Sequence, residues 1–365
     1  MNKENRKTIS SIGRSRKRNA ITYLMLFALF AIFQTISSTK NLSRSTSGQL
    51  VPICVYVVVT LALNLVVGFS GELSLGHAGF LSIGAFSGVA FYHLFQFVGS
   101  PTVQLILSMI CAGIISGLFG FVIGIPVLRL RGDYLAIVTL AFGEIIKNVM
   151  NCIYLGYDSE GWHFGFSKSL TLASGGVTVL NGPMGVTGNK KVSTFLIGFI
   201  LVIFAYTLII NLMNSKTGRA IIAIRDNRIA AESVGLSATR YKMTAFVVSA
   251  FLTGMAGALY VMNYASVAPS KFNFNTSILV LVFVVMGGMG NLQGGILAAI
   301  ILTVLPEKLR SVGDYRMLIY AILLILMMLT TQSAKGRELL RKIFKPVRGG
   351  SRKDRSSDAK GADKA

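Results

Sequence analysis

SKTGRAIIAIRDNRIAAESVGLSATRYK, residues 215–242, is a basic and polar stretch between two apolar segments, 192–213 and 243–263. Each segment has the roughly 20 residues that an α-helix needs to cross a bilayer. A chain that mostly faces hydrocarbon has little use for such a loop unless a soluble partner binds it. The stretch therefore predicts an all-α integral membrane protein, and a membrane subunit that another protein drives.

The composition supports the membrane assignment. Hydrophobic residues make up 53% of the 365 residues and charged residues only 14%, whereas a soluble domain carries about 25% charged residues. The apolar residues also occur in runs of about 18 or more, the length of a membrane span. A large soluble helical core is the alternative, and these run lengths argue against it.

The formal net charge of +22 does not indicate a nucleic-acid partner. Lys and Arg gather at the two ends of the chain and in the 215–242 loop, which is the positive-inside pattern of membrane proteins. No module for stacking on bases or reading them accompanies these residues, and basic tails of this kind can lie on anionic lipid. We expect membrane lipid to be a partner and nucleic acid not to be.

Nine apolar regions follow one another along the chain, and one of them is too long for a single span. Region 277–305 has about 29 residues, or ~43 Å of helix, which exceeds one upright crossing and falls short of two. Five glycines between Gly287 and Gly295 interrupt it, so we expect two short or tilted helices joined by a Gly-rich turn. The predicted fold class is a polytopic bundle of about nine to ten transmembrane helical elements with Gly-interrupted segments. The other spans are expected at 20–37, 50–69, 78–98, 103–127, 134–153, 192–213, 243–263 and 314–331.

Charge also predicts which parts lie in the cytoplasm. Residues 1–19 hold seven Lys and Arg and form a basic cytoplasmic tail. Counting crossings through the transmembrane domain, 20–333, then puts the 214–242 loop in the cytoplasm and the 154–191 loop outside. The tail 334–365 returns to the cytoplasm, and its Gly, Ser, Lys and Asp content is typical of disorder.

Capping residues predict a short helix inside the basic loop. Asn227 can accept a backbone hydrogen bond at the start of a helix over Arg228–Val234, and Gly235 can end it in a left-handed conformation. Two helical turns are marginal in water by themselves, so the helix needs a surface to dock on. A solvated loop without a partner is the alternative.

Four stretches along the chain carry a family resemblance. They are LALNLVVGFSGELSLGHAGFLSIGAF (61–86), LRLRGDYLAIVTLAFGEIIKNVM (128–150), GRAIIAIRDNRIAAESVGLSATRYKMTAFVVSAFLTGMAGALY (218–260) and VLVFVVMGGMGNLQGGILAAIILTVLPE (280–307). Together they resemble LivM-type permease subunits of branched-chain amino acid ABC importers, over roughly residues 50–330. The chain departs from that family after its last span, where TTQSAKGRELL replaces an Arg-Pro-x-Gly turn.

The resemblance implies a subunit that acts within a larger complex in the bacterial cytoplasmic membrane. Its partners would be a sister permease in a heterodimer, two cytoplasmic ATPase subunits and an external substrate-binding protein. ATP and Mg²⁺ would bind to the ATPase subunits, and this chain would bind no cofactor. The family's loop pattern, Ala and Glu before a Gly, falls on Ala230, Ala231, Glu232 and Gly235, and polar contacts with the ATPase would come from Arg225, Asp226 and Arg228.

Two Gly-rich breaks interrupt apolar segments, one in each half of the chain: GFSGELSLGHAG (68–79) and GGMGNLQGG (287–295). Paired broken segments in a transporter indicate a binding site near the middle of the membrane, and freed backbone N–H groups there can hold a carboxylate. Kinks that only allow tight packing are the alternative. The residues predicted to line the pathway are Gly71, Glu72, His77, Glu144, Gly287, Gly288 and Asn291.

Ionisable residues in and near the apolar runs are few. Glu144 and Lys147 lie three residues apart on one helix face and can pair. We expect Glu72 at the cytoplasmic end of a span, where exposure costs little, and His77 as a packing or hydrogen-bonding residue. The external loop holds the only tryptophan, Trp162, which fits an aromatic belt at the membrane surface or a surface that meets an external binding protein.

Motifs of several other functions are missing from the sequence. It has no GxxxxGK[ST] pattern, so the chain cannot bind and hydrolyse ATP through a P-loop. Neither metal-ligand spacing nor a nucleophile with its base stands out, which argues against an enzyme. Two other functions stay open: the same machinery importing urea or short amides, and a stand-alone ion- or proton-coupled carrier. A carrier needs several acids at mid-membrane depth, and the sequence offers at most Glu144.

Overall fold

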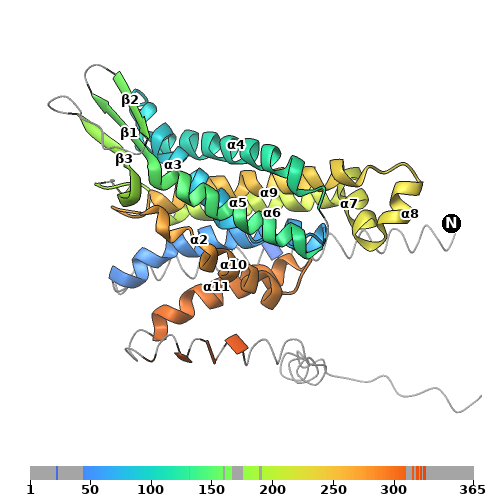
Figure 1. Cartoon of the computed structure of the whole chain (residues 1–365). Helices are drawn as coiled ribbons and strands as arrows, with labels where there is room; N and C mark the ends of the chain where they lie inside the picture. The colour runs from blue at the N-terminus through green and yellow to red at the C-terminus, as the bar shows by residue number, and fades with distance from the viewer. Residues whose placement is uncertain are drawn as a thin grey trace, which may run out of the picture. The chain divides into compact units, whose positions relative to one another are not determined.

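The computed structural model describes most of the chain between residues 44 and 309 (Figure 1). The predicted tails 1–19 and 334–365 lie outside the described residues, as do most of the spans predicted at 20–37 and 314–331. The chain divides into two compact units, Met1–Ser311 and Val312–Ala365. The described residues are 22–23, 44–130, 132–158, 161–166, 176–188, 191–309, 315, 318–319, 321–322 and 324–325.

Helices dominate the first unit and confirm the predicted all-α membrane fold. Among the described residues, six helices are long and apolar enough to cross a membrane. α3 also follows its predicted span but ends four residues early. The six are the continuous helix of α2 (Arg44–Asn64) and the π-helix η1 (Leu65–Phe69), then α4 (Pro101–Val127), α5 (Asp133–Cys152), α6 (Phe195–Asn214), α9 (Ala238–Val261) and the segment Pro269–Gly287, while α3 covers His77–Leu94.

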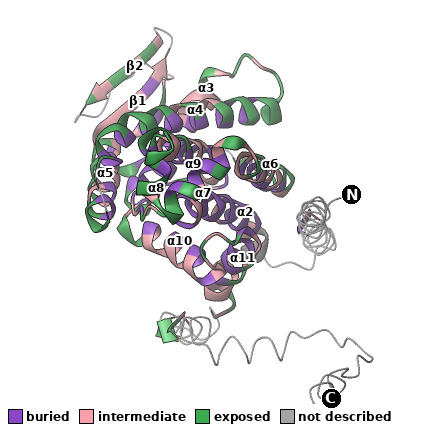
Figure 2. Cartoon of the chain, turned by 90° about the vertical axis from the view of Figure 1, so that its right-hand side faces the viewer, coloured by how far each residue is buried: buried purple, intermediate pink, exposed green. Residues whose placement is uncertain are grey.

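α2 and α9 form the centre of the bundle, and small residues let their neighbours approach. Of the apolar core of each helix, 94% is buried in α2 with η1 and 72% in α9, against 22% in α5 (Figure 2). α9 packs against both α3 and α4. A Cβ at Gly84 of α3 would overlap the backbone of Gly254 in α9, so the two helices touch through their backbones there.

The long apolar region 277–305 is a helical hairpin, as its length predicted. α10 (Phe274–Gly287) and α11 (Leu292–Lys308) pack against each other across a turn. Gly288 and Gly290 have φ angles of +89° and +78°, a left-handed conformation that glycine adopts without strain. α11 therefore returns toward the side of the bundle from which α10 starts (Figure 1).

One end of the bundle carries a small antiparallel sheet that the sequence analysis did not predict. Its strands are β1 (Ile153–Asp158), β2 (Gly161–Phe166) and β3 (Val177–Asn181), in the order β2-β1-β3. Two 3₁₀ turns, η2 (Gly182–Met184) and η3 (Pro269–Lys271), lie beside it. We call this the sheet end of the bundle.

The opposite end carries the basic loop with which the sequence analysis began (Figure 1). The loop contains two helices, α7 (Lys216–Asp226) and α8 (Arg228–Ser233). The sequence analysis predicted α8 and missed α7. Ser215 begins α7 by accepting a hydrogen bond from the Gly218 amide at 3.3 Å. We call this the α7–α8 end of the bundle.

Candidate functional site

α8 is capped at both ends as its sequence predicted. The Asn227 Oδ1 atom accepts a hydrogen bond from the Ala230 amide at 3.0 Å. At the other end Gly235 has a φ angle of +84°. Its amide donates to the Glu232 carbonyl at 3.0 Å, and the Leu236 amide donates to the Ala231 carbonyl at 3.1 Å. These paired bonds satisfy the last carbonyls of the helix and fix where it ends.

One side of α8 faces the bundle and the other faces away from it. Ala231 is buried and packs with Ile224 of α7 and Ala238 of α9. Ile229 and Val234, by contrast, are 80% and 76% exposed. An isolated exposed side chain is unremarkable in a soluble protein. Ile229 lies in α8 and Val234 directly follows its last residue, so together they give the helix and its C-terminal end an exposed apolar surface.

α7 faces inward along most of its length. It buries Ala220, Ile221 and Ile224, which recur at the spacing of one helical face. The next residue, Arg225, also turns toward the bundle. Its Nη1 atom donates a hydrogen bond to the Gly68 carbonyl at 3.0 Å, at the end of η1. The loop therefore contacts the first Gly-rich break directly.

The two Gly-rich breaks meet each other at this point. Asn64, fully buried near the end of α2, accepts a hydrogen bond from the Gly290 amide at 2.8 Å and donates one to the Asn291 carbonyl at 3.2 Å. A Cβ at Gly68 would overlap both the Asn64 side chain and the Gly290 amide nitrogen. We call Asn64, Gly68, Gly290 and Asn291 the junction.

Some of the residues predicted to line the pathway lie in or next to the junction, and the others lie elsewhere in the bundle. Asn291 belongs to the junction, while Gly287 and Gly288 end α10 beside it and Gly71 lies against Arg225. The sequence analysis predicted both breaks but not their contact. It also missed Asn64, whose signal was a single amide side chain inside an otherwise apolar run.

Glu72 does not have the exposed position that the sequence analysis expected. Its side chain is only 12% exposed and pairs with Lys242 near the start of α9. The segment between η1 and α3 is not helical: Gly71 and Leu73 are exposed, whereas Ser74 and Gly76 are buried. The Leu75 amide donates to Thr139 of α5 at 3.0 Å. The lysine, 170 residues further along the chain, could not be assigned as a partner from sequence spacing.

His77 is a buried hydrogen-bonding residue, as predicted. Its Nδ1 lies 3.1 Å from the Ser74 hydroxyl oxygen and its Nε2 lies 2.7 Å from that of Ser249. Because the Ser249 hydroxyl donates to the Ala62 carbonyl at 2.6 Å, it accepts from Nε2. This arrangement places a proton on Nε2, with Nδ1 facing the Ser74 hydroxyl.

Glu144 pairs with Lys147, as their spacing predicted. The same carboxylate has a second role that was not predicted. Its Oε1 atom accepts a hydrogen bond from the Phe274 amide at 3.1 Å, in the first turn of α10. A carboxylate is favourable at a helix N-terminus, so Glu144 fastens α10 to α5. This contact lies at the opposite end of α10 from the junction.

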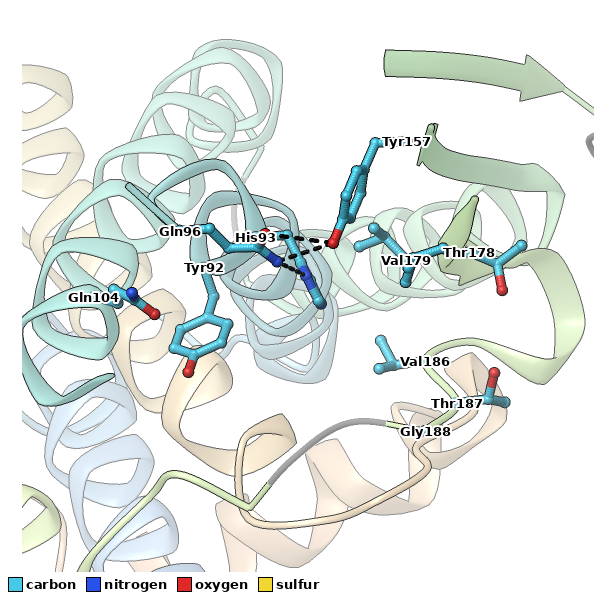
Figure 3. A pocket seen from close by; sticks show the side chains of 11 residues that line it. Tyr92, His93, Gln96, Gln104, Tyr157, Thr178, Val179, Val186, Thr187 and Gly188 are labelled. Atoms are coloured by element: carbon cyan, nitrogen blue, oxygen red, sulfur yellow. Dashed lines mark hydrogen bonds between the residues drawn. The ribbon is translucent and has the colours of Figure 1, made fainter. Parts of the chain in front are cut away.

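A pocket of about 480 Å³ opens at the sheet end (Figure 3). The Gln96 Nε2 atom donates to the Tyr157 hydroxyl at 3.0 Å and lies 3.0 Å from the His93 Nδ1 atom. None of the described residues that line it carries a carboxylate, an amine or a guanidinium. They are Tyr92, His93, Gln96, Gln104, Tyr157, Val177, Thr178, Val179, Val186, Thr187 and Gly188.

Comparison with known proteins assigns the chain to a family. A family model described as "Branched-chain amino acid transport system / permease component" matches residues 45–330, which include both breaks and the α7–α8 loop. The chain belongs to this family. It is therefore a multi-pass membrane permease of the ABC importer class, a transport subunit and not a member of an enzyme family.

Individual relatives agree with the assignment. The permease is 37% identical over 317 residues to the high-affinity branched-chain amino acid transport system permease protein LivM of Salmonella typhimurium, covering 84% of this chain and 73% of the relative. It is 36% identical over 315 residues to LivM of Escherichia coli, covering 83% and 73%. An L-arabinose ABC transporter permease protein, AraH of Azospirillum brasilense, is 25% identical over 295 residues, 79% of each chain. No solved structure matches the permease.

Proposed function

We propose that this permease forms the pathway through which an ABC importer moves branched-chain amino acids across the bacterial cytoplasmic membrane. The α7–α8 end faces the cytoplasm and the sheet end faces outward. The orientation rests on the basic residues of the loop, because cytoplasmic loops are rich in Lys and Arg. ATP is hydrolysed by separate subunits, since the chain has no P-loop pattern.

The observation that carries this proposal is the construction of α8 within a chain of this family. The helix is fixed by Asn227 and Gly235 at its ends and by Ala231 on its inner side. Its outer side presents Ile229 and Val234. A rigid two-turn helix with an exposed apolar face fits a groove on a partner, and the ATPase subunit is the partner that this orientation supplies.

The other partners follow from the same class of transporter. A sister permease, in a heterodimer, completes the pathway, and an external binding protein delivers the substrate to the sheet end. Trp162, Phe164 and Phe166 support this use of the sheet, because they alternate along β2 and are exposed. A membrane-surface belt is the competing use of the same aromatic row.

The proposed mechanism is alternating access. Closure of the two ATPase subunits on ATP pushes α8, and the helices around the two breaks rock between outward-open and inward-open states. Gly71, Glu72, His77, Glu144, Gly287, Gly288 and Asn291 remain the residues that we propose along or beside the pathway. In this proposal the two breaks act as hinges, since they are the points where helical hydrogen bonding stops.

Substrate choice is the finer part of the proposal. The relatives at 36% and 37% identity are named for branched-chain amino acids, whereas sugar import permeases match at 23–25% identity. This difference favours branched-chain amino acids. Urea and short amides stay as the alternative on the same machinery.

The test is uptake by the complete transporter in vesicles. The permease is reconstituted with its sister permease, its ATPase subunits and its binding protein, and labelled leucine, urea and arabinose are supplied in turn. We expect leucine uptake that requires both ATP and the binding protein. Uptake by the permease alone, without any ATPase subunit, would instead identify an ion-coupled carrier, and ATP-dependent uptake of urea alone would change the substrate.

A further inference from the structure

We propose that Arg225 is the positioning residue that transmits movement of the α7–α8 loop to the junction. This inference rests on the proposed function, because it assumes that a partner moves the loop. It also changes the assignment of Arg225 made from the sequence, where the residue was expected to contact the ATPase. The geometry points to a link inside the permease.

The first step of the argument is the group that Arg225 binds. The π-helix η1 ends the long helix that begins at α2, and the carbonyl groups at a helix end lack partners within the helix. Arg225 supplies one of these partners, since its Nη1 donates to the Gly68 carbonyl. A cation is also favourable at a helix C-terminus. The bond joins a charged side chain of the loop to the backbone of the first break.

The second step is the orientation of the guanidinium group. The Asp226 Oδ1 atom accepts hydrogen bonds from Nε at 3.0 Å and from Nη2 at 2.8 Å. These two bonds fix the guanidinium plane and leave Nη1 directed at Gly68. Asp226 is 62% exposed, so it is held by Arg225 and not by the bundle.

The third step is the pair of glycines, Gly71 and Gly290, that lie next to Arg225. A Cβ at Gly71 would lie 2.8 Å from the Arg225 Cγ atom, and a Cβ at Gly290 would lie 4.0 Å from Nη1. Glycine at position 71 therefore leaves the space that the arginine side chain occupies, and Gly290 of the second break lies nearby. Arg225 is thus bonded to the first break at Gly68 and adjacent to the second at Gly290.

These contacts make the junction and α7 a single mechanical unit. Asn64 joins the two breaks to each other, and Arg225 joins the first of them to α7. α8 packs on α7 through Ala231. A push on α8 is therefore carried through α7 and one charge-assisted hydrogen bond to the point where both broken segments meet.

Arg228 is a matched control for Arg225. Each arginine is about one-third exposed, at 36% for Arg225 and 32% for Arg228, and each pairs with a nearby carboxylate. Arg228 donates from Nε to Glu232 at 2.8 Å within α8. The two residues differ in that Arg225 also bonds the junction. The proposal therefore predicts two different losses from the same substitution.

The experiment measures ATP hydrolysis and leucine uptake in the same vesicles, with the complete transporter. In Arg225→Gln we expect uptake to fall roughly tenfold, the effect of losing one charge-assisted hydrogen bond, while ATP hydrolysis stays within about twofold. The ATP consumed per leucine therefore rises roughly tenfold. Arg225→Lys keeps a donor for the Gly68 carbonyl and should recover part of the uptake. In Arg228→Gln both activities should fall together, because docking itself is weakened.

Two results would overturn the proposal. If Arg225→Gln lowers ATP hydrolysis and uptake in the same proportion, Arg225 is a docking residue like Arg228. If it changes neither, the bond to Gly68 plays no part in transport. Asp226→Asn serves as a second variant where Arg225→Gln does not assemble, since it keeps the arginine and only loosens its orientation. A failure of the proposed function is distinguishable, because wild-type vesicles would then show no ATP-dependent uptake.

Discussion

α7 and α8 are consecutive helices of one loop, yet they relate to the bundle in opposite ways. α7 buries its apolar residues and sends Arg225 to the junction. α8 buries only Ala231 and leaves Ile229 and Val234 exposed. A single residue, Asn227, separates them and caps the second.

This difference divides the loop into an inner part, α7, and an outer part, α8, for which we propose different roles. The inner part is held by contacts within this chain, so its geometry is already set. The outer part is fixed in shape, because its caps are local, and its exposed surface is the one that we propose a partner covers. Mutations in α7 should therefore disturb transmission, and mutations in α8 should disturb docking.

The largest expected effect comes from closing the space at the junction. In Gly68→Ala the new methyl group overlaps Asn64 and the Gly290 amide, so the two breaks must separate. We expect uptake to be abolished and the free energy of unfolding to fall by more than the ~1–3 kcal/mol usual for overpacking. Leucine uptake and thermal unfolding of the purified permease measure both effects.

Gly48→Ala is the control for that experiment. Gly48 lies in α2, as part of the same long helix, and a Cβ there meets nothing within 4 Å. Uptake should stay close to that of the wild type. If the two variants behave alike, the close contact between Gly68 and Gly290 has no consequence for transport.

Gly235→Pro is expected to remove the docking helix without disturbing the bundle. Proline cannot adopt the φ angle of +84° and has no amide to donate to the Glu232 carbonyl. The end of α8 should be lost at a cost of about 3 kcal/mol, and substrate-stimulated ATP hydrolysis should drop by at least about tenfold, while the permease still inserts into the membrane. Unchanged stimulation in this variant would show that α8 is not the docking helix.

The features that could be predicted from the sequence are those set by residues close together in the chain or by the length of an apolar run. α8 follows from Asn227 and Gly235, which act within a few residues of each other, and the α10–α11 hairpin follows from the length of an apolar run with glycines in its middle. α7 was missed because its short apolar run, residues 220–224, is flanked by Arg219 and Arg225, and the stretch as a whole resembles a solvated loop.

The remaining features depend on contacts between distant parts of the chain. Asn64 bonds residues more than 220 positions away, and Arg225 bonds Gly68 from 157 positions away. No spacing rule relates such residues. The sheet at the other end was missed for a different reason. Its strands are short, and the sequence analysis interpreted Trp162 as part of a membrane belt or of a surface for a binding protein, without recognising that it lies in a strand.

A smaller effect is expected when the same substitution, isoleucine to valine, is made once in α7 and once in α8. Ile224 of α7 is 2% exposed and Ile229 of α8 is 80% exposed. Ile224→Val should lower the free energy of unfolding by about 0.5–1.5 kcal/mol, because it removes a buried methyl group. Ile229→Val should leave stability unchanged and weaken binding of the ATPase subunit by about twofold. Thermal unfolding and a binding titration test the pair, and an equal loss of stability in both variants would contradict the inner and outer assignment.

The smallest effect is expected at the ion pair on the outer helix. Arg228 and Glu232 are partly exposed, and such a pair four residues apart contributes only about 0.3–0.5 kcal/mol to a helix. Glu232→Gln keeps an acceptor for Arg228, and the caps at Asn227 and Gly235 are untouched. Substrate-stimulated ATP hydrolysis should therefore fall by less than about threefold, far less than in Gly235→Pro. A loss as large as that of Gly235→Pro would mean that the Glu232 carboxylate itself contacts the ATPase, and the apolar surface of α8 would then not be the main docking contact.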